Sequence, residues 1–493
     1  MIKSLEKRYK IYEKTLEKRY KIHEKTLEKR YKKLEKSTKK RYKLSMLERE
    51  ILQRLNEWKN TKPKKALFID GARQIGKTSI IREFARNNYS NFLEINFILQ
   101  PQAAAVFESG GTADEIVTAL TAFSSNHLEK GKSLVFLDEI QECPMARTAI
   151  KTLVQDGRFD YIESGSLLGI QYKEVPSYPV GFEEKFTMYP MNFYEFCLAN
   201  SVPKETLSYL ETCWNEKSPV QEAVHQKMMQ LFEYYIIVGG MPEAVQKFVD
   251  SRDIAQVVQV QKDILELYRQ DITKYSKNDK LRIKQIFDAI PSELNKHNSR
   301  FMLSDLNKNA RTIRYESSFM WLSDAGVSLP CYNLEVPLLP FKINELRNLF
   351  KLFLCDTGLL CAMSMENVQF EILRHNLEVN MGSIVENIVA QILTANEFEL
   401  YYYDKKNFGE LDFVVQKGAD VIPIEIKSGD DFTKHAAINH VLAKGDWNIK
   451  KGIVFCKGNF FESENLLYAP LYSLMFFKQD SIKKNLVVPE ILF

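Results

Sequence analysis

The stretch that most constrains this chain is Ala66–Thr78, where a short apolar run leads into the pattern G-x4-G-K-T at residues 71–78. This spacing is typical of a loop that holds phosphate groups between a strand and a helix. Glycines let successive backbone N–H groups turn toward an anion, the lysine reaches the phosphate oxygens, and the threonine hydroxyl suits a bound Mg²⁺. The pattern therefore predicts a strand at 66–70, a helix from Lys77 to about Asn88, and an ATP site between them.

A second apolar run, residues 134–137, ends in Asp138-Glu139. Such a run suits a buried central strand of a parallel sheet, with its acids at the carboxyl end. We expect Asp138 to hold Mg²⁺ together with Thr78, and Glu139 to orient and polarise the attacking water. Alternating strands and helices up to residue 165 indicate an α/β fold, with helices on both faces of a parallel sheet.

The next expected strand, Phe159–Glu163, ends in Ser164-Gly165-Ser166. A small polar residue at that tip can reach the γ-phosphate or the attacking water, and the alternative is a plain turn. Lys77 and Glu139 are the expected catalytic residues. The expected contacts to ATP and Mg²⁺ come from Gly71, Arg73, Gln74, Gly76, Lys77, Thr78, Ser79, Asp138 and Ser166.

Together with further motifs, these segments resemble the AAA-type ATPases of bacteria and archaea that carry a C-terminal domain of unknown function. The resemblance extends from Met46 to Phe493 and implies Mg²⁺-dependent ATP hydrolysis that drives a conformational switch. It also implies a helical lid at residues 201–280. The further motifs lie at Tyr189–Phe196, Val238–Glu243, Tyr268–Ile272, Lys351–Leu360 and Pro423–Lys427.

Residues 281–345 have the pattern of a winged helix, with a third helix at Thr312–Ala325 and a wing that begins at Cys331. Such three-helix cores bind DNA in many proteins and serve as plain joints between domains in others. Arg311 and Arg314 supply few positive charges, so both interpretations stay open.

The last domain carries two alternating strands, Gly409–Gln416 and Val421–Ser428, around a turn at Gly418-Ala419. With this turn, residues pair across the hairpin when their numbers sum to 837. Asp412 then lies opposite Glu425, on the hairpin face away from the apolar residues.

Two opposed carboxylates are unfavourable unless a cation lies between them. A second Mg²⁺ or an Mn²⁺ ion held by Asp412, Glu425 and Glu386 meets that need, and Lys427 could stabilise charge on a phosphate. Glu386 lies at the edge of the apolar face of a helix expected at 382–395. The pattern resembles PD-(D/E)xK nucleases of the junction-resolving type, which implies a restriction-endonuclease-like α/β domain. The alternative is a charged surface without activity.

The N-terminus has a different composition from the rest of the chain. Residues 4–36 are three copies of an eleven-residue unit, and residues 1–44 carry 18 lysines and arginines against six glutamates. This surplus exceeds the net charge of +4, so the remaining chain is mildly acidic. A basic helix that binds nucleic acid, a coiled coil and a solvated tandem expansion all fit the repeat. The expected domains are 1–45 (basic arm), 46–200 (P-loop core), 201–280 (lid), 281–345 (winged helix) and 346–493 (nuclease-like).

Composition limits the setting in which the chain works. The seven cysteines form no C-x-x-C pair, no apolar run is long enough to span a membrane, and no signal peptide is visible. These features predict a cytoplasmic protein without a membrane partner. DNA, a protein client and an oligomer stay open as partners. The competing interpretation of the output is a regulatory, signalling-type NTPase whose C-terminal half only binds partners.

Overall fold

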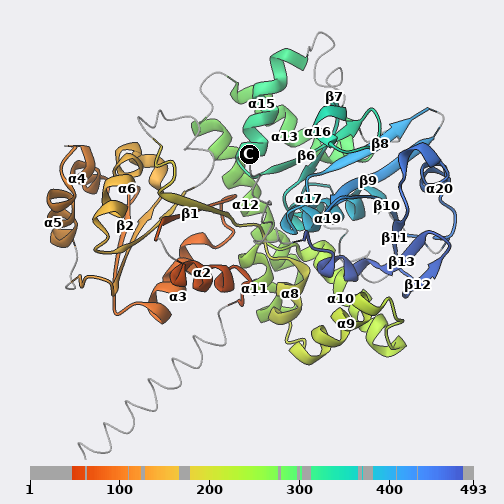
Figure 1. Ribbon diagram of the computed structural model, residues 1–493, viewed down its shortest axis with the longest axis horizontal. Coiled ribbons are helices and arrows are strands. Elements are labelled where there is room, and N and C mark those ends of the chain that lie inside the picture. The colour runs from red at the N-terminus through yellow and green to blue at the C-terminus, as the bar shows by residue number, and fades with distance from the viewer. Residues whose placement is uncertain are drawn as a thin grey trace, which may run out of the picture. The chain divides into compact units, whose positions relative to one another are not determined.

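Contacts in the computed structural model separate Met1–Glu48 from Arg49–Phe493, and the elements below belong to the second unit (Figure 1). The expected repeat helix, like Ser166 and Arg311, lies outside the described residues. The structure describes residues 47–61, 64–108, 110–123, 128–165, 178–275, 279–296, 300–301, 312–364, 369, 381–406, 408–429 and 431–480.

The N-terminal part of this unit is a five-stranded parallel sheet in the order β2-β3-β4-β1-β5. The predicted central position of the strand before Asp138-Glu139 is confirmed, because β3 lies between β2 and β4 and is buried along its length. The strands are β1 (Ala66–Asp70), β2 (Asn91–Asn96), β3 (Ser133–Asp138), β4 (Asp160–Ser164) and β5 (Glu183–Thr187).

Helices pack on this sheet because its strands are apolar on both faces. Phe68, Ile95 and Leu137 belong to one buried cluster with apolar residues of α4, α5 and α6, and the alternate strand residues face the other way. On that other side α3 packs against β3 and α2. The helices are α2 (Ile51–Asn60), α3 (Lys77–Asn88), α4 (Ala105–Glu108), α5 (Ala113–Phe123) and α6 (Pro144–Asp156), with short 3-10 turns at Pro101–Ala104 and Ile140–Glu142.

A helical segment follows, as expected for residues 201–280. Its longest helix, α12, brings Tyr268 and Asp271 to the phosphate loop. The helices are α8 (Phe193–Ala199), α9 (Lys204–Glu216), α10 (Glu222–Val238), α11 (Pro242–Ser251), α12 (Ile254–Tyr275), α13 (Lys280–Leu294) and α15 (Thr312–Asp324).

The C-terminal part is a mixed eight-stranded sheet in the order β12-β13-β11-β10-β9-β8-β6-β7. Leu411, Ile438 and Val454 belong to one of its buried clusters, between the sheet and α20. The strands are β6 (Ser328–Leu334), β7 (Glu345–Leu354), β8 (Tyr401–Lys405), β9 (Gly409–Lys417), β10 (Asp420–Lys427), β11 (Gly452–Cys456), β12 (Phe461–Ser463) and β13 (Leu466–Pro470). The helices are α16 (Phe341–Asn344), α17 (Thr357–Ser364), α19 (Gly382–Ala395) and α20 (Ala436–Leu442), with 3-10 turns at Gly445–Trp447 and Leu471–Phe476.

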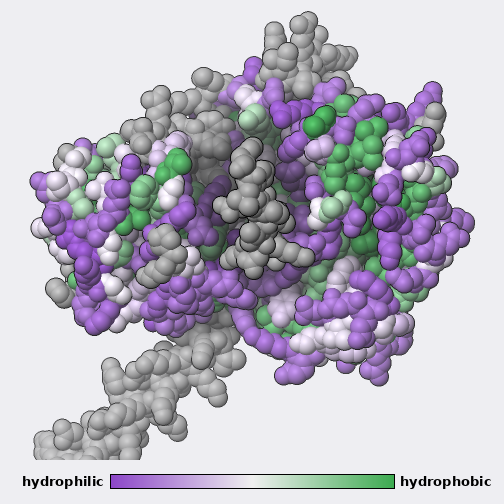
Figure 2. All heavy atoms as spheres, viewed as in Figure 1, coloured by the Kyte–Doolittle hydropathy of each residue, from purple (hydrophilic) through white to green (hydrophobic). Residues whose placement is uncertain are grey.

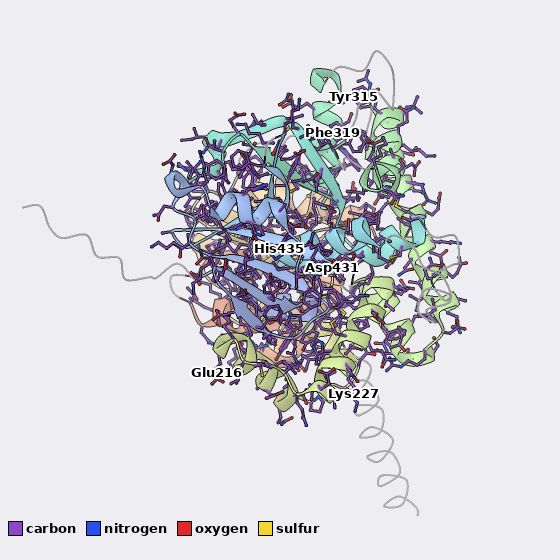
Figure 3. The ribbon with its side chains drawn as sticks, turned by 90° about the vertical axis from the view of Figure 1, so that its right-hand side faces the viewer. Glu216, Lys227, Tyr315, Phe319, Asp431 and His435 are labelled. Atoms are coloured by element: carbon purple, nitrogen blue, oxygen red, sulfur yellow. The ribbon has the colours of Figure 1, made fainter. Side chains whose placement is uncertain are left out.

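The strand expected to form a wing lies within this large sheet. β6 pairs antiparallel with β7 and parallel with β8, so backbone hydrogen bonds cross the expected boundary at 345/346. The winged helix expected at residues 281–345 stays a prediction, and the described part of it has α13 and α15 followed by the β6–β7 hairpin. However, its hairpin is continuous with the C-terminal domain and is not a free wing. Phe319 of α15 packs edge-on against Phe350 of β7 and joins the helices to the sheet (Figure 3).

All seven cysteines are buried free thiols. Burial raises the pKa of Cys197, Cys331, Cys355 and Cys361, and it raises the pKa of Cys456 to about 11. On the face drawn in Figure 2, hydrophobic residues gather mainly over the C-terminal sheet. In the part of the chain that the structure describes, no helix is long and apolar enough to cross a bilayer.

Candidate active site

The phosphate loop lies between β1 and α3 and makes the expected turn. Gly71 and Gly76 have φ angles of 136° and 89°, which glycine adopts without strain. A Cβ atom on Gly71 would also lie 2.2 Å from the carbonyl oxygen of Met188, so packing demands glycine as well. Because β1 is buried at every position, it fixes the point at which the loop begins.

Lys77 is the first residue of α3, and its side chain turns back over the loop. Its Nζ donates to the carbonyl oxygens of Gly71 and Ala72 at 2.9 and 2.7 Å. Burial lowers the pKa of Lys77 to about 8, while Glu139 and Asp138 oppose that shift. The site therefore places a half-buried ammonium group where a phosphate anion would stabilise its charge.

Asp138 joins three of the elements around the loop. Its Oδ2 accepts from Thr78 Oγ1 at 3.0 Å and from Asn96 Nδ2 at 2.9 Å, and its Oδ1 accepts from Ser164 Oγ at 2.5 Å. The structure thus brings the predicted pair Thr78 and Asp138 together. Asn96 and Ser164 were not among the predicted site residues. Their signal was their position, because each lies at the carboxyl end of a strand that neighbours β3.

Glu139 follows directly and adopts a left-handed backbone conformation, with φ 54° and ψ 46°. A non-glycine residue rarely has a positive φ, and such residues gather at functional sites. Glu139 Oε2 accepts from Gln141 Nε2 at 2.5 Å. Gln141 is 2% exposed, so it holds the carboxylate in one orientation.

The other predicted nucleotide contacts differ in where their side chains lie. Gln74 and Ser79 are exposed at the loop and at the start of α3. The guanidinium of Arg73 instead faces α12, where Nη1 lies 2.5 Å from Asp271 Oδ1. Ser166 lies outside the described residues.

Arg49 contacts the phosphate loop through its guanidinium group. The sequence did not predict it as a site residue. Its Nη1 donates to the carbonyl oxygen of Ile75 at 2.9 Å, and its Nη2 donates to that of Tyr189 at 2.7 Å. Its Nε pairs with the buried Glu195 at 3.0 Å. The charged groups of Arg49 therefore link the phosphate loop to the start of the helical segment.

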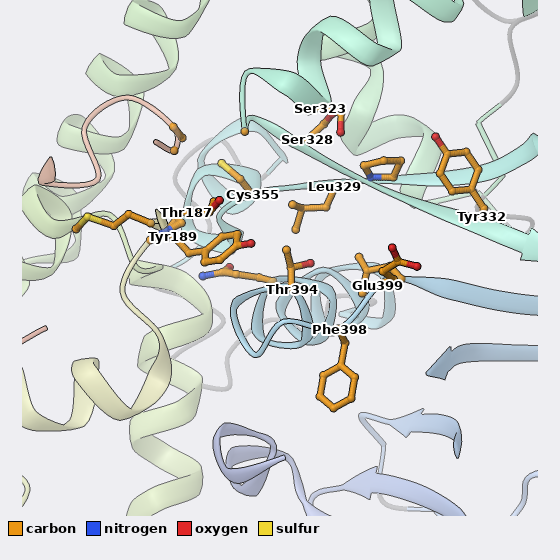
Figure 4. Close-up of a pocket in the computed structure, with 18 of the residues that line it drawn as sticks. Thr187, Tyr189, Ser323, Ser328, Leu329, Tyr332, Cys355, Thr394, Phe398 and Glu399 are labelled. Carbon is orange, nitrogen blue, oxygen red and sulfur yellow. The ribbon is translucent and has the colours of Figure 1, made fainter. Parts of the chain in front are cut away.

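A cavity of about 310 Å³ lies beside the loop, between β5 and the C-terminal part (Figure 4). Gly71 and Ala72 form one wall, and Tyr189, Leu329 and Thr394 face its interior. Its lining mixes apolar, hydroxyl and backbone groups without a cluster of charge. Gly71 and Ala72 also carry the carbonyl oxygens that Lys77 contacts, so the cavity borders the phosphate loop directly.

The C-terminal hairpin has the predicted register. Lys417 pairs with Asp420 and Phe413 with Ile424, so the sum of 837 is confirmed along the ladder from 413/424 to 417/420. Asp412 Oδ2 accepts from the backbone N–H of Ile426 at 2.7 Å. This contact places Asp412 next to β10, one position beyond the pair of Phe413 and Ile424.

Lys351 of β7 is the feature of this region that the sequence did not reveal. Its Nζ lies 3.0 Å from Glu386 Oε2 and 2.6 Å from Glu410 Oε1, and its side chain is 1% exposed. The carboxylates raise the pKa of Lys351 despite its burial. Lys427 pairs in turn with Glu425 at 2.8 Å. Two ammonium groups thus contact two of the three carboxylates for which we expected a metal ion, Glu386 and Glu425.

Two carboxyl groups of the hairpin, those of Asp412 and Glu425, have raised pKa values. Burial raises the pKa of Asp412 well above its ordinary value, and Glu425 raises it further. Burial also raises the pKa of Glu425, while Lys427 and His435, labelled in Figure 3, lower it. Like charges and burial therefore both disfavour ionisation here.

The metal set expected in the C-terminal part stays a prediction, and the described residues give it no support. Among the described residues, no group of three or more His, Cys, Asp or Glu side chains is arranged to hold a metal ion. Glu386, Asp412 and Glu425 do lie within electrostatic reach of one another. However, Lys351 binds Glu386, and Lys427 binds Glu425. At these two carboxylates an ammonium group supplies the positive charge that a metal ion was expected to supply.

The parallel sheet with its glycine loop defines a P-loop NTPase-like α/β fold. The model of a family described as an AAA domain matches residues 63–197, so this segment is similar to AAA domains. Two families described only as domains of unknown function, DUF8612 and DUF4143, match residues 229–369 and 381–474. A comparison with curated protein sequences returns no match.

Three solved structures are similar at low identity. A Walker-type ATPase of Pyrococcus abyssi has 15% identity over 64% of this chain and 96% of its own, with a TM-score of 0.41. The Orc1 protein of Aeropyrum pernix, solved in complex with DNA, has 13% identity over 65% and 93%, with a TM-score of 0.29. The RuvB Holliday junction branch migration motor of Thermotoga maritima has 15% identity over 58% and 87%, with a TM-score of 0.26. These scores carry no argument about function.

Proposed function

We propose that the AAA-type domain binds ATP with Mg²⁺ at the phosphate loop and hydrolyses it with Glu139 as the residue that orients water. The observation that supports this most is the meeting of Thr78 and Asp138 at 3.0 Å, beside Lys77 and Glu139. Hydroxyl and carboxylate oxygens in small number are the protein ligands that Mg²⁺ prefers in phosphate-transfer sites. Bound there, the ion supplies positive charge to the phosphate oxygens.

Each side chain of the proposed ATP site has its own role. Lys77 binds the β- and γ-phosphates, and releasing its two loop carbonyls lets its ammonium face the anion. Thr78 and Asp138 hold the ion, while Ser164 and Asn96 keep the Asp138 carboxylate turned toward Thr78. Glu139 accepts a hydrogen bond from the attacking water and aligns it with the γ-phosphate.

Two variants test this assignment by equilibrium ATP binding and by phosphate release. Lys77→Ala should abolish ATP binding, because the phosphates lose their main cationic partner. Glu139→Gln should keep binding but lower turnover by roughly 10²- to 10³-fold, since the amide cannot polarise water as a carboxylate does. If Glu139→Gln hydrolyses ATP at the parental rate, Glu139 has been assigned the wrong role.

The second part of the proposal concerns the role of the C-terminal half of the chain. We infer that this half is a partner-binding module without catalytic chemistry, driven by the ATPase. Supporting this, Lys351 contacts Glu386 and Lys427 contacts Glu425, and these are two of the three carboxylates expected to hold the metal ion of a PD-(D/E)xK nuclease. Nicking of plasmid DNA with Mn²⁺, lost in Asp412→Asn and Lys427→Ala, would instead establish a nuclease.

DNA binding stays a prediction for this chain. The order of α13, α15 and the β6–β7 hairpin supports it, and the basic arm adds positive charge. Electrophoretic shifts of duplex DNA at rising salt test it, because contacts to phosphates give a steep salt dependence. A protein client and an oligomer stay predictions of the same kind.

A further inference from the structure

Three motifs of the sequence, at Tyr268–Ile272, Val238–Glu243 and Lys351–Leu360, have no part in the chemistry proposed above. The first of them reaches the phosphate loop directly. Tyr268 Oη donates to the carbonyl oxygen of Arg73 at 3.0 Å, and Asp271 Oδ1 lies 2.5 Å from Arg73 Nη1. One loop residue is thus held twice by α12, once through its backbone and once through its side chain.

Burial makes both contacts costly to lose. Tyr268 is 2% exposed and Asp271 is 3% exposed. Burial raises the pKa of Asp271, and Arg73 opposes that shift. Asp271 Oδ2 has no hydrogen-bond partner, so the Arg73 guanidinium is the main compensation for a buried carboxylate.

The helix that carries these residues is itself anchored. Gln261 Nε2 donates to the carbonyl oxygens of Ile237 and Val238 at 2.8 and 2.9 Å. Directly after them, the N–H of Gly240 donates to Asp356 Oδ2 at 2.6 Å. A chain of short contacts therefore runs from Asp356 of the third motif, through the second motif, to α12 and the loop.

Gly326 lies close to Ala72, the residue before Arg73. A Cβ atom on Gly326, after α15, would lie 3.1 Å from the backbone nitrogen of Ala72. The φ of Gly326 is 69°, which a side chain rarely permits. Close backbone contact at Ala72 and the two bonds at Arg73 restrain consecutive loop residues, whose N–H groups belong to the phosphate cradle.

We propose that Asp271 and Tyr268 are positioning residues of the ATPase: through Arg73 they hold the phosphate loop in the conformation that binds ATP. This inference rests on the function proposed above. Neither residue touches the reacting atoms. Their loss should therefore weaken ATP binding while the rate of the bound complex changes little.

The test compares KM and kcat for ATP in the full chain. Asp271→Ala should raise KM about tenfold with kcat within about threefold, a size typical of coupled neighbours. Asp271→Asn, which keeps an oxygen acceptor for Arg73, should recover part of the loss. Tyr268→Phe removes only the hydroxyl and should raise KM by a smaller factor. The matched control is Asp263→Asn, which removes an exposed carboxylate of α12 that accepts a hydrogen bond from Gln259.

A double-mutant cycle separates positioning from general destabilisation. If Asp271 acts through Arg73, Asp271→Ala should not raise KM further in an Arg73→Ala background. Independent, additive effects would overturn the inference, as would a lower KM in Asp271→Ala. A parental protein that neither binds nor hydrolyses ATP refutes the proposed function itself. A parent that hydrolyses ATP, with KM unchanged in Asp271→Ala and Tyr268→Phe, refutes only the positioning role.

Discussion

The ammonium of Lys351 lies 3.0 Å from a carboxylate oxygen of Glu386, although 35 residues separate them in the chain. The same ammonium contacts Glu410. Lys351 is therefore the positive centre of a cluster of carboxylates drawn from α19 and β9. The charge balance of the domain depends on this one buried side chain.

Lys351→Met should destabilise the protein, because Glu386 and Glu410 lose their common cation. A loss of about 3 kcal/mol is typical when one partner of a buried ion pair is removed. Glu410 is 30% exposed, so solvent screening should reduce the loss to about 2 kcal/mol. Thermal and urea unfolding of the full chain measure it. Lys342→Met is the control, since that lysine is 62% exposed and pairs at longer distances. Equal losses in both variants would contradict a special role for Lys351.

Asp412→Asn should raise stability at neutral pH. The folded-state pKa of Asp412 is raised above its ordinary 3.8, so the folded protein binds this proton more tightly than the unfolded chain. Its stabilising contribution is therefore complete below about pH 4 and is lost as the pH rises through the folded-state pKa. The variant should gain up to about 1 kcal/mol at pH 7 and little at pH 4.

The comparison of melting temperatures between pH 4 and pH 8 decides this prediction. Asparagine keeps an oxygen that can accept from the N–H of Ile426. The variant therefore changes the charge at this position and retains the hydrogen bond. A parental curve and a variant curve that run parallel would show that Asp412 does not titrate as described.

Gln141→Ala should slow ATP hydrolysis without weakening ATP binding. Gln141 contacts Glu139 through one hydrogen bond, and its loss frees the carboxylate to rotate away from the water. We expect a kcat about tenfold lower with unchanged KM, smaller than the effect of Glu139→Gln. Steady-state phosphate release measures both constants, and an increase in KM alone would contradict this role.

Removal of residues 1–45 should leave folding and ATPase rate intact, since the described contacts of the loop begin at Arg49. It should weaken salt-sensitive nucleic-acid binding, because a surplus of twelve positive charges leaves with it. A truncation that also removes Arg49 should behave differently, as the carbonyl oxygen of Ile75 loses its buried partner. Aggregation of the shorter truncation would refute the view that the arm is an addition.

Local patterns predicted much of the fold. The helix expected at 382–395 is α19, the strand before Asp138 is central, and the hairpin register follows from one turn. Each of these depends on residues within about twenty positions, where periodicity and turn chemistry act. Thr78 and Asp138 are 60 residues apart, but their meeting could be predicted because parallel strands bring the phosphate loop and the end of β3 to the same edge of the sheet.

The side chains that the sequence analysis missed pair with residues far away in the chain. Lys351, Asp271 and Arg49 find their partners 35, 198 and 146 residues away. No short pattern marks such pairs, because tertiary packing selects the partner. β6 was expected in a wing for the same reason: its parallel pairing with β8 depends on the whole C-terminal sheet.

The burial of every cysteine gives the native protein almost no reactive thiol. Thiol reagents attack the exposed thiolate, and the seven thiols are covered, with the pKa of Cys456 raised to about 11. An added cysteine on a surface position of α12, such as Asp263→Cys, would then be the one site that a maleimide dye labels in the folded chain. Its fluorescence would report directly whether that helix moves when ATP is added.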